Sequence, residues 1–437
     1  MLEQTLDLHI HSKYSRACSK SLELPNIARA CEIRGIDIVA TGDFTHPKWF
    51  EHMSEELCEF SEGVYILKDK KLEAGSLMRD RVQIKFILGT EIACIKKHKD
   101  KTRRIHVLVF APNLKVAEKF NTTLAERGFN LRADGRPILG MTPQDLLRLM
   151  LEIDERMVMI PAHAWTPWFG IFGSKGGYDT LKEAFDDLTP HVRAIETGLS
   201  SDPLMNWQLS MLDNITLISN SDAHSPQKLG REANVLQFNA ESEITYDEIM
   251  RIIQTGDKKK FLYTIEFYPE EGKYHYDGHR DCKFVCAPEE TKKLKGICPK
   301  CKRQLVIGVQ NRVEELADRT VFEAQKIRDT KIPFKSLVPL PEILTDVFEC
   351  GVSTKRVVTE YNNLITKFGT EFFILLHADL DKIRMVSSDL VAEAISRVRQ
   401  GKIFVRPGYD GEFGVVKIFS DEDRIVTKPV QVSIDLD

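Results

Sequence analysis

The chain has 437 residues, more than a single hydrophobic core ordinarily serves, so we expect two or three domains. With 42% hydrophobic and 29% charged residues it has the composition of a globular protein, and a net charge of −4 neither indicates nor excludes a nucleic-acid partner, since a local basic face is hidden in the total. No run of about 18 apolar residues predicts a membrane span, and the first residues carry no signal-peptide pattern, so we expect a cytoplasmic protein.

Two histidines stand one residue apart in the first predicted strand, LDLHIH at 6–11. Alternate side chains of a strand point to the same face, so His9 and His11 converge while Leu8 and Ile10 face the apolar side. A single histidine on a strand is usually structural, whereas a convergent pair has the geometry of metal ligands. The opening stretch therefore predicts a metal site.

Short apolar strands alternate with amphipathic helices through the first half of the chain. One helix is expected from Pro25 to Gly35, and another after Thr142, which can cap it with Asp145 in the first turn. Such units predict parallel strands, closed into a barrel or wound as an open sheet, with the chemistry at their carboxyl ends. The other expected strands are, in chain order, 35–43, 82–93, 104–111, 156–164, 192–198 and 215–224.

Most of these strands carry a histidine or a carboxylate at or near their ends. Any one such residue is more often a satisfied core histidine or a capping acid, but burying the whole set unpaired would be costly. Imidazoles mixed with carboxylates favour zinc, manganese or iron over magnesium, and their number exceeds what one ion uses. We therefore expect two or three divalent ions. The candidate ions are Zn, Mn or Mg, of which Mg suits this donor set least. Beyond His9 and His11, the candidate residues are Asp43, His46, Glu91, His106, His163, Glu196, Asp222 and His224.

Six segments in order, DLHIHSKYS, TGDFTHP, GTEI, IHVLVF, PAHAW and SDAH, resemble the motifs of the PHP (polymerase and histidinol phosphatase) superfamily of metal-dependent phosphoesterases. The resemblance covers roughly residues 5–240. It implies an α/β fold, a distorted (β/α)7 barrel, with a trinuclear site at which a water activated by the ions attacks phosphorus.

The resemblance also assigns ligands. A first ion would be held by His9, His11, Glu91 and Asp222. A second would share Glu91 and be held also by His106 and His163. A third would be held by His224 with Asp43 or His46, because Phe44 stands where the family often has a histidine. The catalytic set would be His9, His11, Glu91, His163, Asp222 and His224, with His224 or His46 as alternatives for proton transfer.

Four cysteines crowd into one short segment, in a CxxxC…CxxC arrangement typical of a structural four-cysteine zinc site. The surrounding loops are rich in lysine, which usually marks a solvated surface but beside a phosphoesterase suits a nucleic-acid backbone. The expected zinc ligands are Cys282, Cys286, Cys298 and Cys301. The candidate backbone contacts are Lys292, Lys293, Lys295, Lys300, Lys302 and Arg303.

The chain after residue 310 indicates less about function. Segments 311–319 and 387–401 predict helices, and 404–419 predicts a hairpin around Gly408 and Gly411. His377 and Asp379 repeat the ligand spacing, but without supporting ligands nearby they predict a capping or packing pair. We expect a PHP barrel over 1–262, a zinc-ribbon-like module over 263–310 and an α+β accessory DNA-binding region over 311–437.

Barrel, ribbon and C-terminal region together resemble the endonuclease Q family. This resemblance implies a DNA repair endonuclease that cuts the phosphodiester 5′ of a deaminated base (uracil, hypoxanthine or xanthine) or of an abasic site, in double- or single-stranded DNA. Two alternatives stay open: a PHP phosphatase for a small phosphomonoester such as histidinol phosphate, and a binding module with a degenerate barrel. The near-complete ligand set weighs against the binding module.

A Gly- and Pro-rich stretch after His163 carries five aromatic side chains. An enzyme that extrudes a base needs a pocket for the base and a filler for the gap, and aromatic rings stack a base for about 1–3 kcal/mol each. The alternative, that this loop only packs over the rim of the barrel, fits the sequence equally well. The candidate base pocket or wedge consists of Trp165, Trp168, Phe169, Phe172 and Tyr178.

Overall fold

The computed structural model describes residues 1–68, 83–99, 101–420 and 422–423. The chain divides into two compact units. Unit 1 comprises Met1–Lys335 and a returning segment, Pro407–Gly414; unit 2 comprises Ser336–Arg406 and the chain from Val415 onward. The expected division at residues 262 and 310 stays a prediction, and residues 424–437 of the expected accessory region lie outside the described residues.

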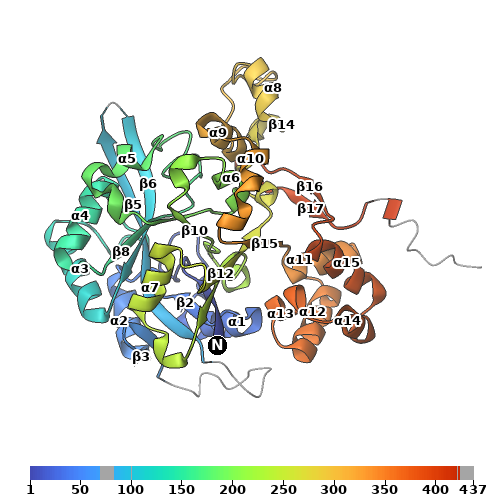
Figure 1. Cartoon of the computed structure of the whole chain (residues 1–437), viewed down its shortest axis with the longest axis horizontal. Helices are drawn as coiled ribbons and strands as arrows, with labels where there is room; N and C mark the ends of the chain where they lie inside the picture. The colour runs from blue at the N-terminus through green and yellow to red at the C-terminus, as the bar shows by residue number, and fades with distance from the viewer. Residues whose placement is uncertain (69–82, 100, 421, 424–437) are drawn as a thin grey trace, which may run out of the picture. The chain divides into compact units, whose positions relative to one another are not determined.

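Unit 1 is an α/β structure built around a mixed sheet, in which the described residues form eleven strands (Figure 1). Its strands are β1 (Leu2–Asp7), β2 (Ile38–Ala40), β3 (Leu57–Ser61), β4 (Val64–Leu67), β5 (Lys85–His98), β6 (Lys101–Ala111), β7 (Ile138–Leu139), β8 (Val158–Pro161), β11 (Ala233–Phe238), β12 (Phe261–Phe267) and β15 (Phe334–Leu337). The main path runs β15-β12-β11-β1-β2-β5-β4-β3, while β6 pairs with β5 and β8, and β7 with β5. A separate parallel pair is formed by β9 (Ala194–Glu196) and β10 (Thr216–Ile218).

Strand directions are only partly as expected. The strands β1, β2 and β5 run parallel, as the alternation of strands and helices predicts. The strand β6 is antiparallel to β5 and β8, so the expectation of parallel strands is wrong there. The reason is the connection: β5 ends at His98 and β6 begins at Lys101, and so short a link can only join antiparallel strands.

The helices of unit 1 begin and end where local chemistry indicates. They are α1 (Leu24–Arg34), α2 (Pro47–Glu56), α3 (Leu114–Glu126), α4 (Pro143–Ile153), α5 (Leu181–Phe185), α6 (Pro203–Asn206) and α7 (Tyr246–Thr255). The prediction for α1 is confirmed, since Pro25 lies in its first turn and Gly35 ends it in a left-handed conformation. In α4 Thr142 and Asp145 form a reciprocal capping box.

The core lies between the sheet and these helices. Strand residues such as Leu6, Ile38 and Ile87 are fully buried and share one apolar cluster with Ile249 and Ile253 of α7. The helices α3 and α4 lie side by side (Figure 1). Close packing of this kind holds the strand ends, and the polar side chains that follow them, in fixed positions.

The cysteine-rich segment is a small appendage of unit 1 with its own apolar cluster of Cys286, Cys298 and Leu305. It contains β13 (Asp277–His279), β14 (Phe284–Cys286) and α8 (Pro288–Lys293), and is followed by α9 (Val309–Leu316) and α10 (Val321–Lys326). The pair β13 and β14 is antiparallel. The helix predicted at 311–319 corresponds to α9.

Unit 2 is mainly helical. It contains α11 (Leu340–Phe348), α12 (Lys355–Phe368), α13 (Glu371–Leu376), α14 (Leu380–Val386) and α15 (Asp389–Arg399), with the hairpin β16 (Phe404–Arg406) and β17 (Val415–Lys417). The hairpin is confirmed, as is the capping role of Asp379, which accepts a hydrogen bond from the Lys382 amide at the start of α14. None of the helices in the described part of the chain is long and apolar enough to cross a bilayer.

Candidate functional site

A first group of ligand atoms gathers at the ends of β1, β10 and the middle of β5. His9 Nε2 lies 3.5 Å from Glu91 Oε2 and 3.5 Å from Asp222 Oδ1. His11 Nε2 lies 3.3 Å from the same Glu91 oxygen and 3.2 Å from the same Asp222 oxygen. Four donors from three distant segments therefore surround one point, with both histidines and Glu91 almost completely buried.

A second group forms on the other oxygen of Glu91. His106 Nδ1 lies 2.6 Å and His163 Nε2 3.0 Å from Glu91 Oε1. The hairpin of β5 and β6 explains the convergence: Glu91 is paired with Leu108 and Ala93 with His106, so Glu91 and His106 are diagonal neighbours on one face. One carboxylate thus faces two ligand groups with its two oxygens, the arrangement that bridges a pair of ions.

Carboxylates behind the histidines orient the rings. Glu196, at the end of β9, places Oε2 3.0 Å from His9 Nδ1, and Asp43 places Oδ1 3.1 Å from His11 Nδ1. A carboxylate on the far nitrogen selects the tautomer that leaves Nε2 free for a metal. Asp43 is held in turn by the backbone amide of Ser12, at 2.7 Å, and by the Ser12 and Ser15 hydroxyls.

Three residues of the site have a left-handed backbone that side chains other than glycine rarely adopt. The φ angles are 48° at Asp43, 30° at His163 and 47° at Asp222. Such conformations cost on the order of 1–3 kcal/mol each and persist where the surroundings over-determine them. All three lie two to four residues after the end of a strand, where the chain turns sharply to aim a side chain into the site.

The charges of the site hold Glu91 and His106 in forms that can ligate. Burial raises the pKa of Glu91, but His106, Arg136 and His9 outweigh it and hold the pKa well below the usual range, so the group is a carboxylate. Burial lowers the pKa of His106 to about 4 despite the nearby Glu91, so this ring is neutral. Ionised carboxylate and neutral imidazole are the forms that bind metal. Burial lowers the pKa of His9, His11 and His163, but neighbouring carboxylates outweigh it and raise the pKa of all three rings, so metal binding there would displace a proton.

The donor set fits divalent metal ions. His9 Nε2 is buried without a hydrogen-bond partner and lies inside the first group, the position of a ligand atom. Three or four ligand atoms of each group lie within 4.8 Å of one another. The described residues therefore provide groups suited to divalent metals on both sides of Glu91, and the expected sharing of Glu91 between two ligand sets is what the geometry presents.

The expected third ion has less support. His224 Nδ1 lies 3.6 Å from Asp222 Oδ1, but within the described residues no group of three candidate ligands contains His224, Asp43 or His46. Asp43 is occupied by His11 and two serines, as above. His46 occupies the N-cap position of α2 without a side-chain capping hydrogen bond, and its ring stacks on Tyr14, with ring centroids 4.3 Å apart. The third ion, with Asp43 or His46 completing its site, therefore stays a prediction.

Arg136 is a residue of the site that the sequence reasoning missed. Its Nη1 lies 3.0 Å from Glu91 Oε2, and its side chain is a quarter exposed. The preceding Gly135 allows the segment to pass close to the site, because a Cβ there would overlap the Asp43 carboxylate and the Ser15 hydroxyl. The segment 130–137 has no periodicity or metal-ligand motif, so nothing in the sequence marked it.

A cavity of about 530 Å³ opens over the second ligand group, within the size range of small-molecule pockets. Four basic residues line it: Arg136, Lys228, Arg231 and Lys273. Metal ligands form its floor. A cationic wall above a metal-ligating floor suits a phosphate ester.

The five aromatic residues expected to form a base pocket are divided by the structure. Trp165, Phe172 and Tyr178 are buried inside unit 1 and do not line this cavity, with Trp165 Nε1 donating to Asn206 at 2.8 Å. Phe169 lines the cavity and stacks on His106, with ring centroids 4.3 Å apart. Trp168 is 39% exposed.

The cysteine-rich segment brings together a set of ligands that differs from the expected one. The group within 4.8 Å consists of His279, Cys282, Cys298 and Cys301, with His279 Nδ1 3.6 Å from Cys301 Sγ. Cys286 is outside it and lies 3.2 Å from the Thr291 hydroxyl. Three cysteines and a histidine are a donor set as typical of structural zinc as four cysteines, and the four-cysteine set stays a prediction. The six basic residues predicted to contact a nucleic-acid backbone are all exposed.

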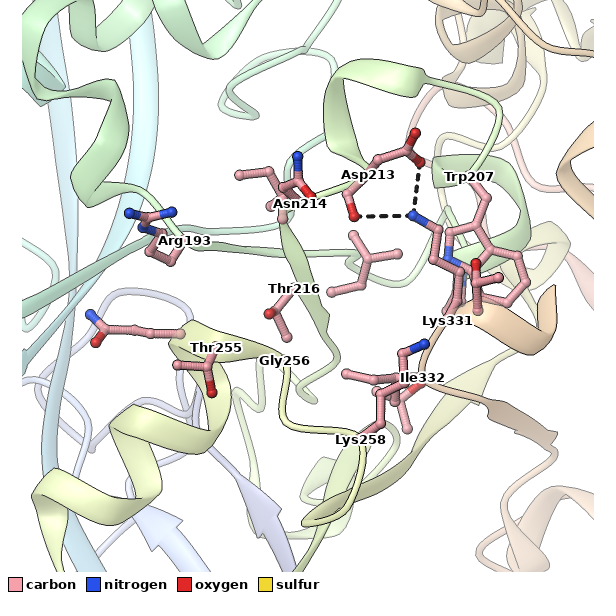
Figure 2. Close-up of a pocket in the computed structure, with 16 residues that line it drawn as sticks. Arg193, Trp207, Asp213, Asn214, Thr216, Thr255, Gly256, Lys258, Lys331 and Ile332 are labelled. Carbon is pink, nitrogen blue, oxygen red and sulfur yellow. Dashed lines mark hydrogen bonds and ion pairs between the residues drawn. The ribbon is translucent and has the colours of Figure 1, made fainter. Parts of the chain in front are cut away.

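A second cavity, of about 720 Å³, contains none of the candidate ligands (Figure 2). It lies at the amino ends of β9 and β10, next to Arg193 and Thr216, whereas Glu196 and Asp222 follow the carboxyl ends. Asp213 and Lys331 close one side through an ion pair of 2.8 Å. This cavity therefore lies at the opposite end of β9 and β10 from the metal ligands.

The sequence of the chain was compared with those of known proteins. Residues 339–402 match the model of the MJ0043 C-terminal domain. The chain is 33% identical over 258 residues to the uncharacterized protein MJ0043 of Methanocaldococcus jannaschii, an alignment that covers 58% of this chain and 31% of that protein's length. The chain thus spans about a third of that relative.

Two solved structures match over nearly the whole chain. The lesion-specific endonuclease PfuEndoQ of Pyrococcus furiosus is 29% identical, with a TM-score of 0.82 and 100% of both chains covered. Endonuclease Q in complex with a 27-mer duplex substrate that has an abasic lesion at the active site is 30% identical, with a TM-score of 0.83, covering 98% of this chain and 99% of that one. The chain belongs to the endonuclease Q family. Its fold is accordingly the α/β PHP fold of endonuclease Q, as expected from the motifs.

Proposed function

We propose that this protein is a DNA repair endonuclease that hydrolyses the phosphodiester 5′ of a deaminated base or of an abasic site. The observation that carries the proposal is Glu91, whose two oxygens face two ligand groups on the floor of a cavity with a basic wall. The full-length likeness to an endonuclease Q bound to a lesion-containing duplex supports DNA as the substrate over a small phosphomonoester.

The residues divide the work as follows. His9, His11, Glu91 and Asp222 would hold one divalent ion and Glu91, His106 and His163 another. Bound ions of this kind activate water as a nucleophile and neutralise charge on the phosphate. Glu196 and Asp43 keep the rings of His9 and His11 in register, and the guanidinium of Arg136 is placed to pair with a phosphate oxygen.

Zinc in the group of His279 and three cysteines would hold the small module together, and its exposed lysines would contact the DNA backbone. Such contacts are independent of sequence and weaken with salt. Uracil, hypoxanthine and xanthine are proposed as the deaminated bases, because deamination weakens pairing and lowers the cost of extrusion.

The test is incision of end-labelled duplexes carrying one uracil, one hypoxanthine or one abasic site, against an undamaged duplex, with Mg²⁺ or Mn²⁺. We expect one cut, 5′ of the lesion, which is abolished by chelation and restored by added metal. Glu91→Gln should lower the rate at least about 100-fold, and Glu62→Gln, on the exposed surface, serves as the matched control. Hydrolysis of a chromogenic monoester with no cleavage of any duplex would contradict the proposal.

A further inference from the structure

The second cavity, at the amino ends of β9 and β10, lies within unit 1 and contains none of the candidate metal ligands. Its volume of about 720 Å³ is in the range of pockets that enclose a small organic molecule. Its walls come from segments far apart in the sequence. They are joined by the hydrogen bond from the Thr216 amide to the Arg193 carbonyl, 2.9 Å long, and by the ion pair of Asp213 with Lys331. The cavity is therefore built into the fold of the unit.

Two hydrogen-bond donors on the walls of this cavity are buried and unused. Thr216 is 7% exposed and Trp207 4%, and both line the cavity (Figure 2). Within the described part of the chain, neither the Thr216 hydroxyl nor the Trp207 Nε1 atom has a hydrogen-bond partner. Donors that are buried without an acceptor are costly, and an indole N–H can only donate. A ligand of this cavity would therefore supply acceptor atoms.

The charges on the walls favour a negative ligand. Asp213 is the one acidic residue among the described residues that line the cavity, and it is paired with Lys331. Arg193 and Lys258 are exposed, and among the described residues their side chains form no ion pair or hydrogen bond. In the view of Figure 2 they lie on either side of Thr216. Two long cationic side chains beside one free hydroxyl suit a phosphate group.

The rest of the lining suits a base. Asn214 and Gln254 line the cavity, and their side-chain amides have no partner among the described residues. An amide presents a donor and an acceptor side by side, the pattern that matches the edge of an adenine. Ile215, Ile332 and the indole of Trp207 add apolar surface for the face of a ring. The cavity therefore combines an anion site with a site for a planar group that has a polar edge.

We propose that this cavity binds a nucleoside monophosphate. The phosphate lies between Arg193 and Lys258 and accepts from the Thr216 hydroxyl, and the base lies against Trp207 with its edge on the amides. The site is at the opposite end of β9 and β10 from the metal ligands, so the inference goes beyond the proposed nuclease activity and does not depend on it.

The test is calorimetric titration of the full chain with AMP. We expect one AMP to bind per chain, and both adenosine and inorganic phosphate to bind at least about tenfold more weakly, because each lacks part of the contacts. Lys258→Gln and Arg193→Gln should each raise the dissociation constant of AMP about tenfold or more, the usual effect of losing a charged hydrogen-bond donor. The matched control is Lys259→Gln, which removes the neighbouring exposed lysine that does not line the cavity and should change the constant less than about twofold.

Each other outcome would overturn the inference and leave the nuclease proposal standing. Without saturable AMP binding there is no nucleotide site. Inorganic phosphate that binds as tightly as AMP would leave an anion site only, and adenosine that binds as tightly would show that the cations take no part. Equal effects of Lys258→Gln and Lys259→Gln would mean that only the general surface charge matters. Loss of AMP binding in Glu91→Gln, with none in Arg193→Gln, would place the nucleotide at the metal ligands.

Discussion

At the scale of single residues, the site depends on how one carboxylate is shared. Glu91 is buried, ionised and in contact with ligand groups on both oxygens, and Arg136 lies 3.0 Å from one of them. Metal ions held by Glu91 would compete with the guanidinium for this carboxylate. The guanidinium would still line the cavity, where it could form two hydrogen bonds to a phosphate.

Arg136→Ala is expected to lower kcat on lesion-containing DNA by about 100-fold, the usual effect of removing one donor to a developing negative charge. Arg136→Lys should recover only part of the activity, because an ammonium lacks the planar pair of donors. Steady-state cleavage kinetics give the result, with Arg132→Ala, an exposed arginine of the same segment, as the control. A rate for Arg136→Ala within twofold of the wild type would contradict this role.

At the scale of elements, the cysteine-rich module is organised by two short knuckles. His279 and Cys282 are three residues apart, as are Cys298 and Cys301, and the turns bring the four side chains together. The spacing HxxC in GHRDC was present in the sequence, but counting cysteines alone pointed to Cys286. Cys286 packs in the same apolar cluster as Cys298, with its sulfur 3.2 Å from the Thr291 hydroxyl.

His279→Ala is expected to release zinc from this module at a chelator concentration at least about tenfold lower than the wild type needs, since one of four ligands is lost. Cys286→Ser should keep the wild-type zinc content because its side chain is outside the ligand group. Zinc per chain, measured by elemental analysis across a chelator titration, distinguishes the two. The reverse order of sensitivity would restore the four-cysteine set.

At the scale of the whole molecule, stability is linked to carboxyl groups buried away from the metal ligands. Burial raises the pKa of Glu266, on β12, to about 7, although hydrogen bonds from the Ser219 and Thr264 hydroxyls oppose the shift. The folded protein therefore keeps a proton that the unfolded chain loses near its ordinary pKa of 4.5. Unfolding releases this proton between those two values, so the contribution of Glu266 to stability falls as pH rises from about 4.5 to about 7.

Glu266→Gln should remove this dependence. The amide keeps an acceptor for Ser219 and Thr264, and its nitrogen can donate to the Thr197 hydroxyl, 3.4 Å from the other carboxyl oxygen. At pH 8 the variant should be more stable than the wild type by on the order of 1–3 kcal/mol, with the gain vanishing near pH 4.5. Urea unfolding at both pH values measures it, with the exposed Glu55→Gln as control. A gain of equal size at both pH values would refute the assignment to Glu266.

The sequence alone determined the chemistry available to this protein. Some features were predictable because each depends on residues close together in the sequence. They are the alternation in LDLHIH, the caps of α1 and α4, and the hairpin at 404–419. Motif order was enough to indicate the PHP fold. Residue type and local spacing were enough to predict six metal ligands: His9, His11, Glu91, His106, His163 and Asp222.

Only the tertiary structure decided which groups meet. It brings Arg136 to Glu91, assigns Asp43 to the back of His11, places His279 beside Cys282, Cys298 and Cys301, and carries Phe413 to the cavity. Each of these contacts joins segments whose local patterns say nothing of one another. Their separation in the sequence is bridged by strand pairing and core packing, which depend on the whole fold.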